Sequence, residues 1–234
     1  LIPVFSDFHA PFMRASLKGA GCDSVLLASG AYGRTAALGL AQVNNDACFA
    51  TIITAGRAIM AMEEEKSSVD GGSSKICALP CLCPGCRSKD APWFIQRALE
   101  GEALDGARVL NLLDLDEGFC DDVCADLPEC LACGLVVGDI VLQLENYLAP
   151  LISKGGLSSG KASSELARCR TEAIFAAESG EKEAVWRAAK QADACARRYL
   201  DEVSDFPVIG VVGSYPAIFD RGINDGLIAK IRDE

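Results

Sequence analysis

The stretch KICALPCLCPGCR, residues 75–87, joins a short apolar run to a cysteine-rich loop. The run at 75–80 predicts a buried β-strand, because it is short, apolar and followed by turn-forming residues. Pro92 suits the first turn of a following helix, and the apolar run ARVLNLL at 107–113 predicts the next strand. A strand, a helix and a second strand in this order favour parallel pairing.

The same alternation extends outward from this stretch in both directions. Further apolar runs predict strands at 2–5, 24–28 and 207–213. Helical spacing of apolar residues predicts helices at 34–43, 49–65, 92 onward, 121–152, 163–178, 182–203 and 223–231. We therefore expect an α/β protein with a doubly wound, mainly parallel, Rossmann-like sheet.

The expected sheet is followed by a helical connector and by the start of a second Rossmann-like unit. Residues 154–164 are rich in glycine and serine and predict a linker. The expected boundaries are 1–153 for the first, cluster-binding half-domain, 154–205 for the connector and 206–234 for a truncated start of the second unit.

Composition narrows the class of protein. Half of the 234 residues are hydrophobic and 24% are charged, which is typical of a globular chain with an apolar core. The net charge of −11 argues against nucleic-acid binding, which needs clustered lysine and arginine. We expect no membrane span, because the longest apolar run, 134–144, contains Asp139. With no signal peptide visible, the expected location is cytoplasmic.

Twelve cysteines are the unusual feature of the composition. A disulfide scaffold is the poorer interpretation for a chain with a large core and no secretory signal. Reduced thiols fit better, some as metal ligands and others as small buried hydrophobes. Cys22, Cys169 and Cys195 have no ligand-type residues nearby in the sequence, so we expect them to be packing residues.

Cys48 and Cys86 are the candidate site residues. Cys48 follows the turn sequence Asn44-Asn45-Asp46 and opens the helix expected from Phe49, and Cys86 follows the strand expected at 75–80. Both therefore fall where parallel strands end and helices begin, which is the ligand-binding edge of an open α/β sheet. Backbone amides at a helix start favour a thiolate, which suits a metal ligand or a nucleophile.

Two further cysteine groups leave a zinc site open as an alternative. They are Cys77, Cys81, Cys83 and Cys86, and then Cys120, Cys124, Cys130 and Cys133. Each group contains a C-x2-C pair of the kind that binds zinc. However, Cys77 falls inside an expected strand, and the two pairs are more widely separated than in common zinc ribbons. The lone histidine, His9, gives little support to a hydrolase triad. It is interpreted as a helix-start residue, with the alternative that it lines the site at the end of the first expected strand.

Four segments in register resemble the 2-hydroxyacyl-CoA dehydratase D-component family. They are PVFSDFHAPF at 3–12, NNDACF at 44–49, PGCR at 84–87 and VIGVVGSYPAIFDRGINDGL at 208–227. The sequence is most similar to the branch found in large CoA-substrate-specific enzyme activase proteins. The resemblance implies two Rossmann-like halves that hold an iron–sulfur cluster between them.

The resemblance also assigns roles to individual residues. Cys48 falls on the family's cysteine in the turn that opens a helix, and Cys86 falls on its Gly-Cys-Arg cysteine. A further ligand would come from the second half. The chain departs from the family in having Ala50 in place of proline after the aromatic residue, and Cys83-Pro84-Gly85 in place of a run of glycines.

What the resemblance implies is an iron–sulfur electron-transfer or reductase domain of an anaerobic protein. Its cofactor would be a [4Fe-4S] or double-cubane cluster, and its electron donor an ATP-dependent activator module in cis or in trans. The reaction is either dehydration of an acyl-CoA substrate by a lyase or cluster-dependent reduction of a small molecule. Two alternatives stay open: a non-catalytic scaffold domain of a fused activase, and a zinc-stabilised interaction domain.

Overall fold

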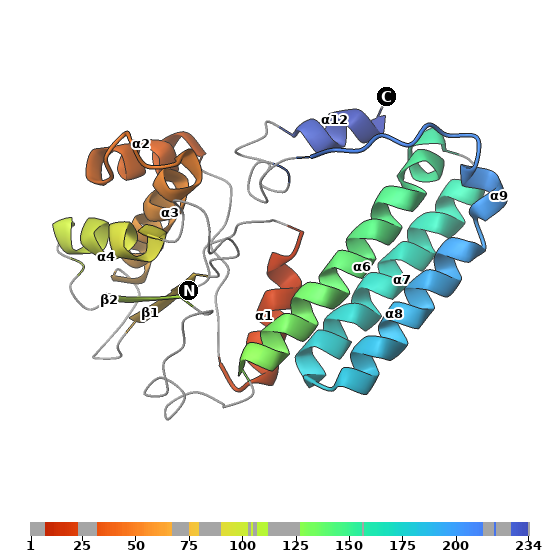
Figure 1. Cartoon of the computed structure of the whole chain (residues 1–234), viewed down its shortest axis with the longest axis horizontal. Helices are drawn as coiled ribbons and strands as arrows, with labels where there is room; N and C mark the ends of the chain where they lie inside the picture. The colour runs from red at the N-terminus through yellow and green to blue at the C-terminus, as the bar shows by residue number, and fades with distance from the viewer. Residues whose placement is uncertain are drawn as a thin grey trace. The chain divides into compact units, whose positions relative to one another are not determined.

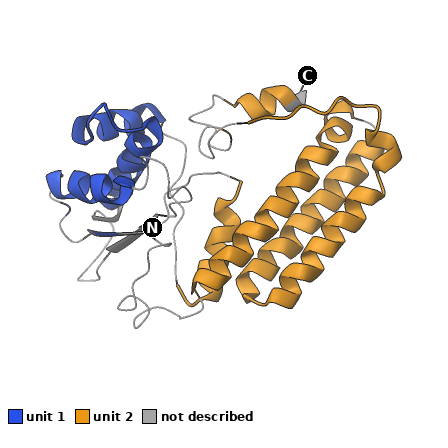
Figure 2. Cartoon of the chain, viewed as in Figure 1, with its two compact units in different colours: residues 1–5, 24–122 blue, residues 6–23, 123–234 orange. Residues whose placement is uncertain are grey.

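The structure is a computed structural model of the chain, and it divides into two compact units. Unit 1 comprises Leu1–Phe5 and Ser24–Asp122, and unit 2 comprises Ser6–Asp23 and Val123–Glu234 (Figure 2). The residues that the structure describes are 8–22, 32–66, 75–79, 90–102, 104, 107–111, 127–155, 157–212, 218 and 226–233. The three-part division predicted from the sequence, with boundaries at 153 and 205, stays a prediction about domains.

The described residues of unit 1 form three helices and two short strands. They are α2 (Tyr32–Gln42), α3 (Phe49–Lys66), β1 (Lys75–Leu79), α4 (Ala91–Gly101) and β2 (Ala107–Asn111) (Figure 1). The strands pair in parallel, with Lys75 opposite Ala107 and Leu79 opposite Asn111. The strands predicted at 75–80 and 107–113, their parallel pairing and the helix between them are thus confirmed.

Helices α2 and α3 cross at unusually close range because each has a glycine at the crossing. A Cβ atom on Gly56 would lie 1.8 Å from the backbone oxygen of Thr35, and one on Gly39 would lie 2.0 Å from that of Ile52. The close approach buries α3 on all sides from Thr51 to Ile59, whereas its apolar spacing predicted one buried face. The apolar core around it also includes residues of α4, among them Ile95 and Leu99.

Unit 2 is an all-helical assembly in its described part. Its elements are α1 (Ala10–Gly19), α6 (Leu127–Lys154), α7 (Leu157–Ser179), α8 (Lys182–Arg197), the short α9 (Leu200–Val203) and α12 (Leu227–Asp233). Figure 1 shows α6, α7 and α8 side by side, with α1 lying against them. The glycine- and serine-rich stretch predicted as a linker at 154–164 is mostly the first turns of α7.

Two glycines set the packing of α1 on α6. In the sequence GLVVG they stand one turn apart, and a Cβ on Gly134 would lie 2.2 Å from Ser16 Oγ while one on Gly138 would lie 2.8 Å from His9 Cδ2. Small residues at this spacing let two helices approach closely along one face. The apolar core between α1, α6, α7 and α8 includes Phe12, Val137 and Val141.

The predicted fold class is wrong. Helices make up most of the described residues, and the strands within those residues are limited to β1 and β2, of five residues each. That is not a doubly wound parallel sheet. The strands predicted at 2–5 and 24–28 lie outside the described residues.

The strand predicted at 207–213, which was to start the second Rossmann-like unit, is part of the wrong fold prediction. Residues 207–212 of the expected strand form no strand, and the side chains of Val208 and Val212 are each 98% exposed. A strand needs a neighbour to receive its backbone hydrogen bonds. Residues 207–212 have the composition of a buried strand but are not paired with another strand among the described residues.

Helix α6 is long and apolar enough to cross a membrane by length and composition alone. Half of its most apolar 18-residue window is buried inside the protein, where α1, α7 and α8 pack against it. The central helix of a helical core passes the same test, so this finding is weak support for a membrane span.

Candidate functional site at the start of α3

Cys48 is the residue from which α3 begins. Its backbone oxygen accepts hydrogen bonds from the N–H groups of Thr51 (2.9 Å) and Ile52 (3.2 Å), which closes the first turn. The preceding turn forms as predicted: the side-chain oxygen of Asn44 accepts the N–H of Asp46 at 3.1 Å. The sequence prediction that Cys48 opens a helix is confirmed.

The thiol of Cys48 is half-buried and has a hydroxyl beside it. Cys48 Sγ lies 3.0 Å from Thr51 Oγ1, one turn along α3, and either group can be the donor. Thr51 itself is only 4% exposed, so its hydroxyl is held in place by the surrounding core. If the sulfur became a thiolate, the hydroxyl would donate to it.

An aromatic pair borders the same end of α3. The ring of Phe49 packs edge-on against the ring of Tyr32 at a centroid distance of 6.1 Å, and Phe49 is 46% exposed. Phe49 follows Cys48 directly in the chain, so this aromatic pair lies at the end of α3 that carries the thiol. The start of α3 therefore combines a half-buried sulfur, a buried hydroxyl and a neighbouring aromatic pair.

Cys86, the second predicted site residue, lies outside the described residues, as do Cys81, Cys83, Cys120 and Cys124. Cys77 lies within β1, as predicted. In the described ranges, no group of three or more histidine, cysteine, aspartate or glutamate side chains is arranged to hold a metal ion. The donor chemistry of Cys48 fits an iron–sulfur cluster, and the described residues supply one thiol toward it.

Cys130 and Cys133, a C-x2-C pair in the alternative zinc site, lie in the first turns of α6. Cys130 is buried, and its sulfur lies 3.0 Å from where a Cβ on Gly180 would stand. Cys133 is half-buried, and burial followed by the charge of Glu129 raises its pKa. A raised pKa keeps the thiol protonated, which opposes metal ligation unless a metal displaces the proton.

His9 lies at the start of α1 in unit 2, consistent with the helix-start interpretation. Its ring is 1% exposed, and Nε2 lies 2.8 Å from Asp139 Oδ1 on α6. Burial lowers the pKa of His9, opposed by the hydrogen bond and the charge of Asp139. The aspartate that interrupts the apolar run of α6 therefore serves as a partner for a buried ring.

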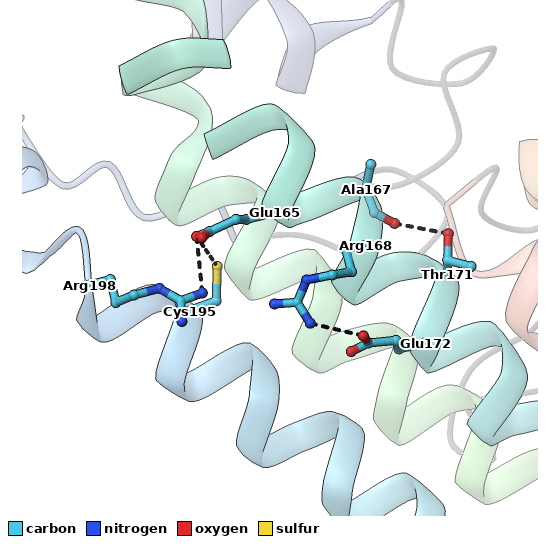
Figure 3. Close-up of polar contacts among 7 residues, drawn as sticks. All are labelled: Glu165, Ala167, Arg168, Thr171, Glu172, Cys195 and Arg198. Carbon is cyan, nitrogen blue, oxygen red and sulfur yellow. Dashed lines mark hydrogen bonds and ion pairs between the residues drawn. The ribbon is translucent and has the colours of Figure 1, made fainter. Parts of the chain in front are cut away.

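Sequence reasoning missed a polar cluster between α7 and α8. Cys195 donates to Glu165 Oε2 over 3.5 Å, and the same oxygen accepts a hydrogen bond from Arg198 Nη2 at 3.0 Å (Figure 3). Cys169 belongs to the same core cluster as Cys195. Cys169 and Cys195 are buried, as predicted for packing residues, whereas Cys22 is half-buried and Cys195 also bonds to Glu165. The helical spacing of Glu165 to Cys169 and of Cys195 to Arg198 was the available signal.

Unit 2 also contains an open apolar cavity of about 620 Å³ between α6, the segment 206–211 and α12. Its lining includes Leu142, Ala149, Ile209 and Ile228, with Lys154 as the charged group among the described lining residues. Among the described residues that line it there is no thiol or carboxylate.

Comparisons with known proteins place the chain in no family: no protein-family model, no curated protein and no solved structure matches it.

Proposed function

We propose that this chain is an iron–sulfur electron-transfer domain in which Cys48 and Cys86 are thiolate ligands of the cluster. The observation that supports the proposal is the setting of Cys48: a free, half-buried thiol at the start of a buried helix, 3.0 Å from a fixed hydroxyl. Bound to these thiolates, the cluster supplies one-electron transfer. The protein supplies the ligands, the hydrogen bond and the apolar surroundings.

The start of α3 suits a cluster ligand for two physical reasons. The first turn of a helix has backbone N–H groups without helical partners, and their dipoles stabilise negative charge. The Thr51 hydroxyl adds a directed donor at the sulfur, and such hydrogen bonds help to set the reduction potential of a cluster. Cys48 also contributes no disulfide that would block ligation.

The wider function proposed for this domain comes from the family resemblance of its four segments. An ATP-dependent activator module delivers a low-potential electron, and the domain uses it on an acyl-CoA or another small-molecule substrate in the anaerobic cytoplasm. Four short segments in register carry this part of the proposal, including NNDACF around Cys48 and PGCR around Cys86.

The test is anaerobic production of the whole protein, followed by measurement of iron, acid-labile sulfide and zinc and by visible absorbance. We expect a brown protein that bleaches in air. Cys48→Ser and Cys86→Ser should each abolish or greatly reduce cluster content. Cys22→Ser, which changes a thiol at the end of α1, is the matched control and should leave cluster content unchanged.

Other outcomes would identify the alternatives. A colourless protein with stoichiometric zinc would support a zinc-stabilised interaction domain, and loss of zinc in Cys133→Ser would place it at the C-x2-C pair. A protein that binds neither metal would support a scaffold role. Unchanged cluster content in Cys48→Ser would disprove the assignment of this ligand.

A further inference from the structure

Cys169 and Cys195 face each other across the interface of α7 and α8. Their side chains are 3% and 0% exposed, and both belong to one core cluster with Leu148 and Tyr199. Both are free cysteines, and each is among the groups that shift the pKa of the other. Free thiols from neighbouring helices that pack into one core cluster are positioned to be joined by a disulfide, which spans Cα atoms up to about 7 Å apart.

A salt bridge covers this pair of thiols. Glu165 on α7 and Arg198 at the end of α8 pair at 3.0 Å, with side chains 20% and 47% exposed, so they lie nearer to solvent than the thiols (Figure 3). The Glu165 oxygen that binds Arg198 also accepts the hydrogen bond from the Cys195 thiol. A carboxylate that accepts this bond favours the protonated thiol over the thiolate.

We propose that Cys169 and Cys195 form an oxidisable dithiol, a modification site that closes to a disulfide between α7 and α8 and that Glu165 holds in the reduced state. This site belongs to unit 2 and does not depend on the proposed cluster at Cys48. The oxidant is a low-molecular-weight disulfide such as oxidised glutathione.

The chemistry balances as two thiol–disulfide exchanges. The Cys169 thiol loses its proton to water, and its thiolate attacks one sulfur of oxidised glutathione, releasing one glutathione thiolate. The Cys195 thiol then loses its proton, attacks the mixed disulfide at Cys169 and releases the second glutathione thiolate. The protein has then lost two electrons, which the oxidant has gained, and a Sγ–Sγ bond joins the helices.

The environment makes this reaction slow at neutral pH. Burial is the main cause that raises the pKa of Cys195 to about 11, and the neighbouring Cys169 and Glu165 add to it. Burial also raises the pKa of Cys169, partly offset by the positive charge of Arg168. Since only thiolates attack disulfides, closure should accelerate as pH rises toward these values.

The direct test is to incubate the folded full-length chain with oxidised glutathione at pH 8.5, alkylate free thiols, digest without reductant and map disulfides by mass spectrometry. We expect peptides that contain Cys169 and Cys195 to be joined. Cys169→Ala and Cys195→Ala should each lose the joined peptide, while Cys48→Ser should retain it whatever its effect on a cluster. Free thiols at both positions, or their pairing with other cysteines or with glutathione alone, would overturn the proposal.

A second measurement tests the role of Glu165 without removing either thiol. In Glu165→Gln, the side-chain shape is kept and the negative charge is lost, so closure should be several-fold faster at neutral pH and its pH dependence should shift downward. Circular dichroism before oxidation checks that the helices are intact. An unchanged pH dependence in a folded variant would show that Glu165 does not hold the pair reduced.

The disulfide should also stabilise unit 2, because it closes a long loop in the unfolded chain. We expect Tm to rise by about 5 °C or more after oxidation and to return on reduction. In Cys169→Ala the same treatment should leave Tm unchanged. A lower Tm in the oxidised protein would mean that closure strains the helix interface and would contradict the inferred geometry.

Discussion

Helix α3 of unit 1 and helix α6 of unit 2 are both buried centres of their units, yet they are built differently. α3 is buried on every side between Thr51 and Ile59 and still carries polar side chains there, including Thr54 and Arg57. α6 buries one face, and the polar group that interrupts its apolar run, Asp139, reaches a buried ring from the surface. The polar groups of α3 are internal, whereas those of α6 are mostly peripheral.

Cys48 of unit 1 and Cys195 of unit 2 also differ, in their burial and in their hydrogen-bond partners. Cys48 at the start of α3 is half-buried with a hydroxyl beside it, whereas Cys195 in unit 2 is fully buried and donates to a carboxylate. A thiol that solvent can reach is available for ligation, and a buried one that donates to a carboxylate stays protonated. The comparison shows that the role of each cysteine depends on its burial and its hydrogen-bond partners, and not on how many cysteines the chain contains.

The largest expected effect is on thiol reactivity. In metal-free protein at pH 7, Cys48 should be alkylated by iodoacetamide about a thousandfold faster than Cys195, because the buried thiol forms little thiolate and is reached only through local opening. Alkylation followed by quantitative peptide mass spectrometry gives both rates. After denaturation the rates should converge. Equal rates in the folded protein would remove the distinction between the two environments.

The next effect concerns the glycine crossing of α2 and α3. Gly56→Ala should reduce the free energy of unfolding by about 3 kcal/mol, because the new Cβ meets the backbone oxygen of Thr35 and neither helix can move without disturbing the core. Gly33→Ala is the matched control: among the described residues nothing lies within 4 Å of its Cβ position. Urea unfolding followed by circular dichroism measures both. Equal stabilities would mean that the helices cross less closely.

The corresponding crossing in unit 2 should be more tolerant. Gly138→Ala should cost about 2 kcal/mol, because its Cβ meets the ring of His9, a side chain that can shift, rather than backbone. Gly160→Ala on α7 has open space among the described residues and should stabilise by about 0.5–1 kcal/mol through helix propensity. The same urea experiment applies. A larger loss for Gly138→Ala than for Gly56→Ala would reverse the comparison.

A smaller effect should appear in the pH dependence of unit 2. Burial lowers the folded-state pKa of His9 below the ordinary histidine value of 6.5, so the unfolded chain binds the proton more readily. Stability from this group is therefore full above pH 6.5 and is lost as the pH falls from there through the folded pKa. His9→Gln, which can still donate to Asp139, should flatten the slope between pH 7 and pH 5. An unchanged slope would assign it to other groups.

A Thr51→Val substitution tests the smallest difference, the hydroxyl beside Cys48. The shape is kept and one hydrogen bond to sulfur is lost. In the proposed holoprotein we expect unchanged iron content and a reduction potential more negative by on the order of 40 mV, equivalent to about 1 kcal/mol for one electron. Protein-film voltammetry measures this shift. An unchanged potential would show that Thr51 does not donate to a cluster ligand.

Local features were predictable where the residues that cause them are neighbours in the sequence. The turn at Asn44–Asp46, the helix start at Cys48 and the strands β1 and β2 follow from nearby residues. The buried polar positions of α3 did not follow, because burial on all sides depends on which helices pack around it. The hydrogen bond of Cys195 to Glu165 was missed for the same reason, since it joins residues on separate helices.

The amino-acid sequence by itself determined the local elements: where the main helices run, where β1 and β2 lie, and which thiol opens α3. Only the tertiary structure decided the fold class, because apolar periodicity gives the face that an element buries but not the partner that covers it. Residues 207–212 have the composition of a core strand and are not one, and α6 has the composition of a membrane span and is half-buried among helices. In both cases the deciding factor is the neighbour that packs or pairs, which a single stretch of chain does not encode.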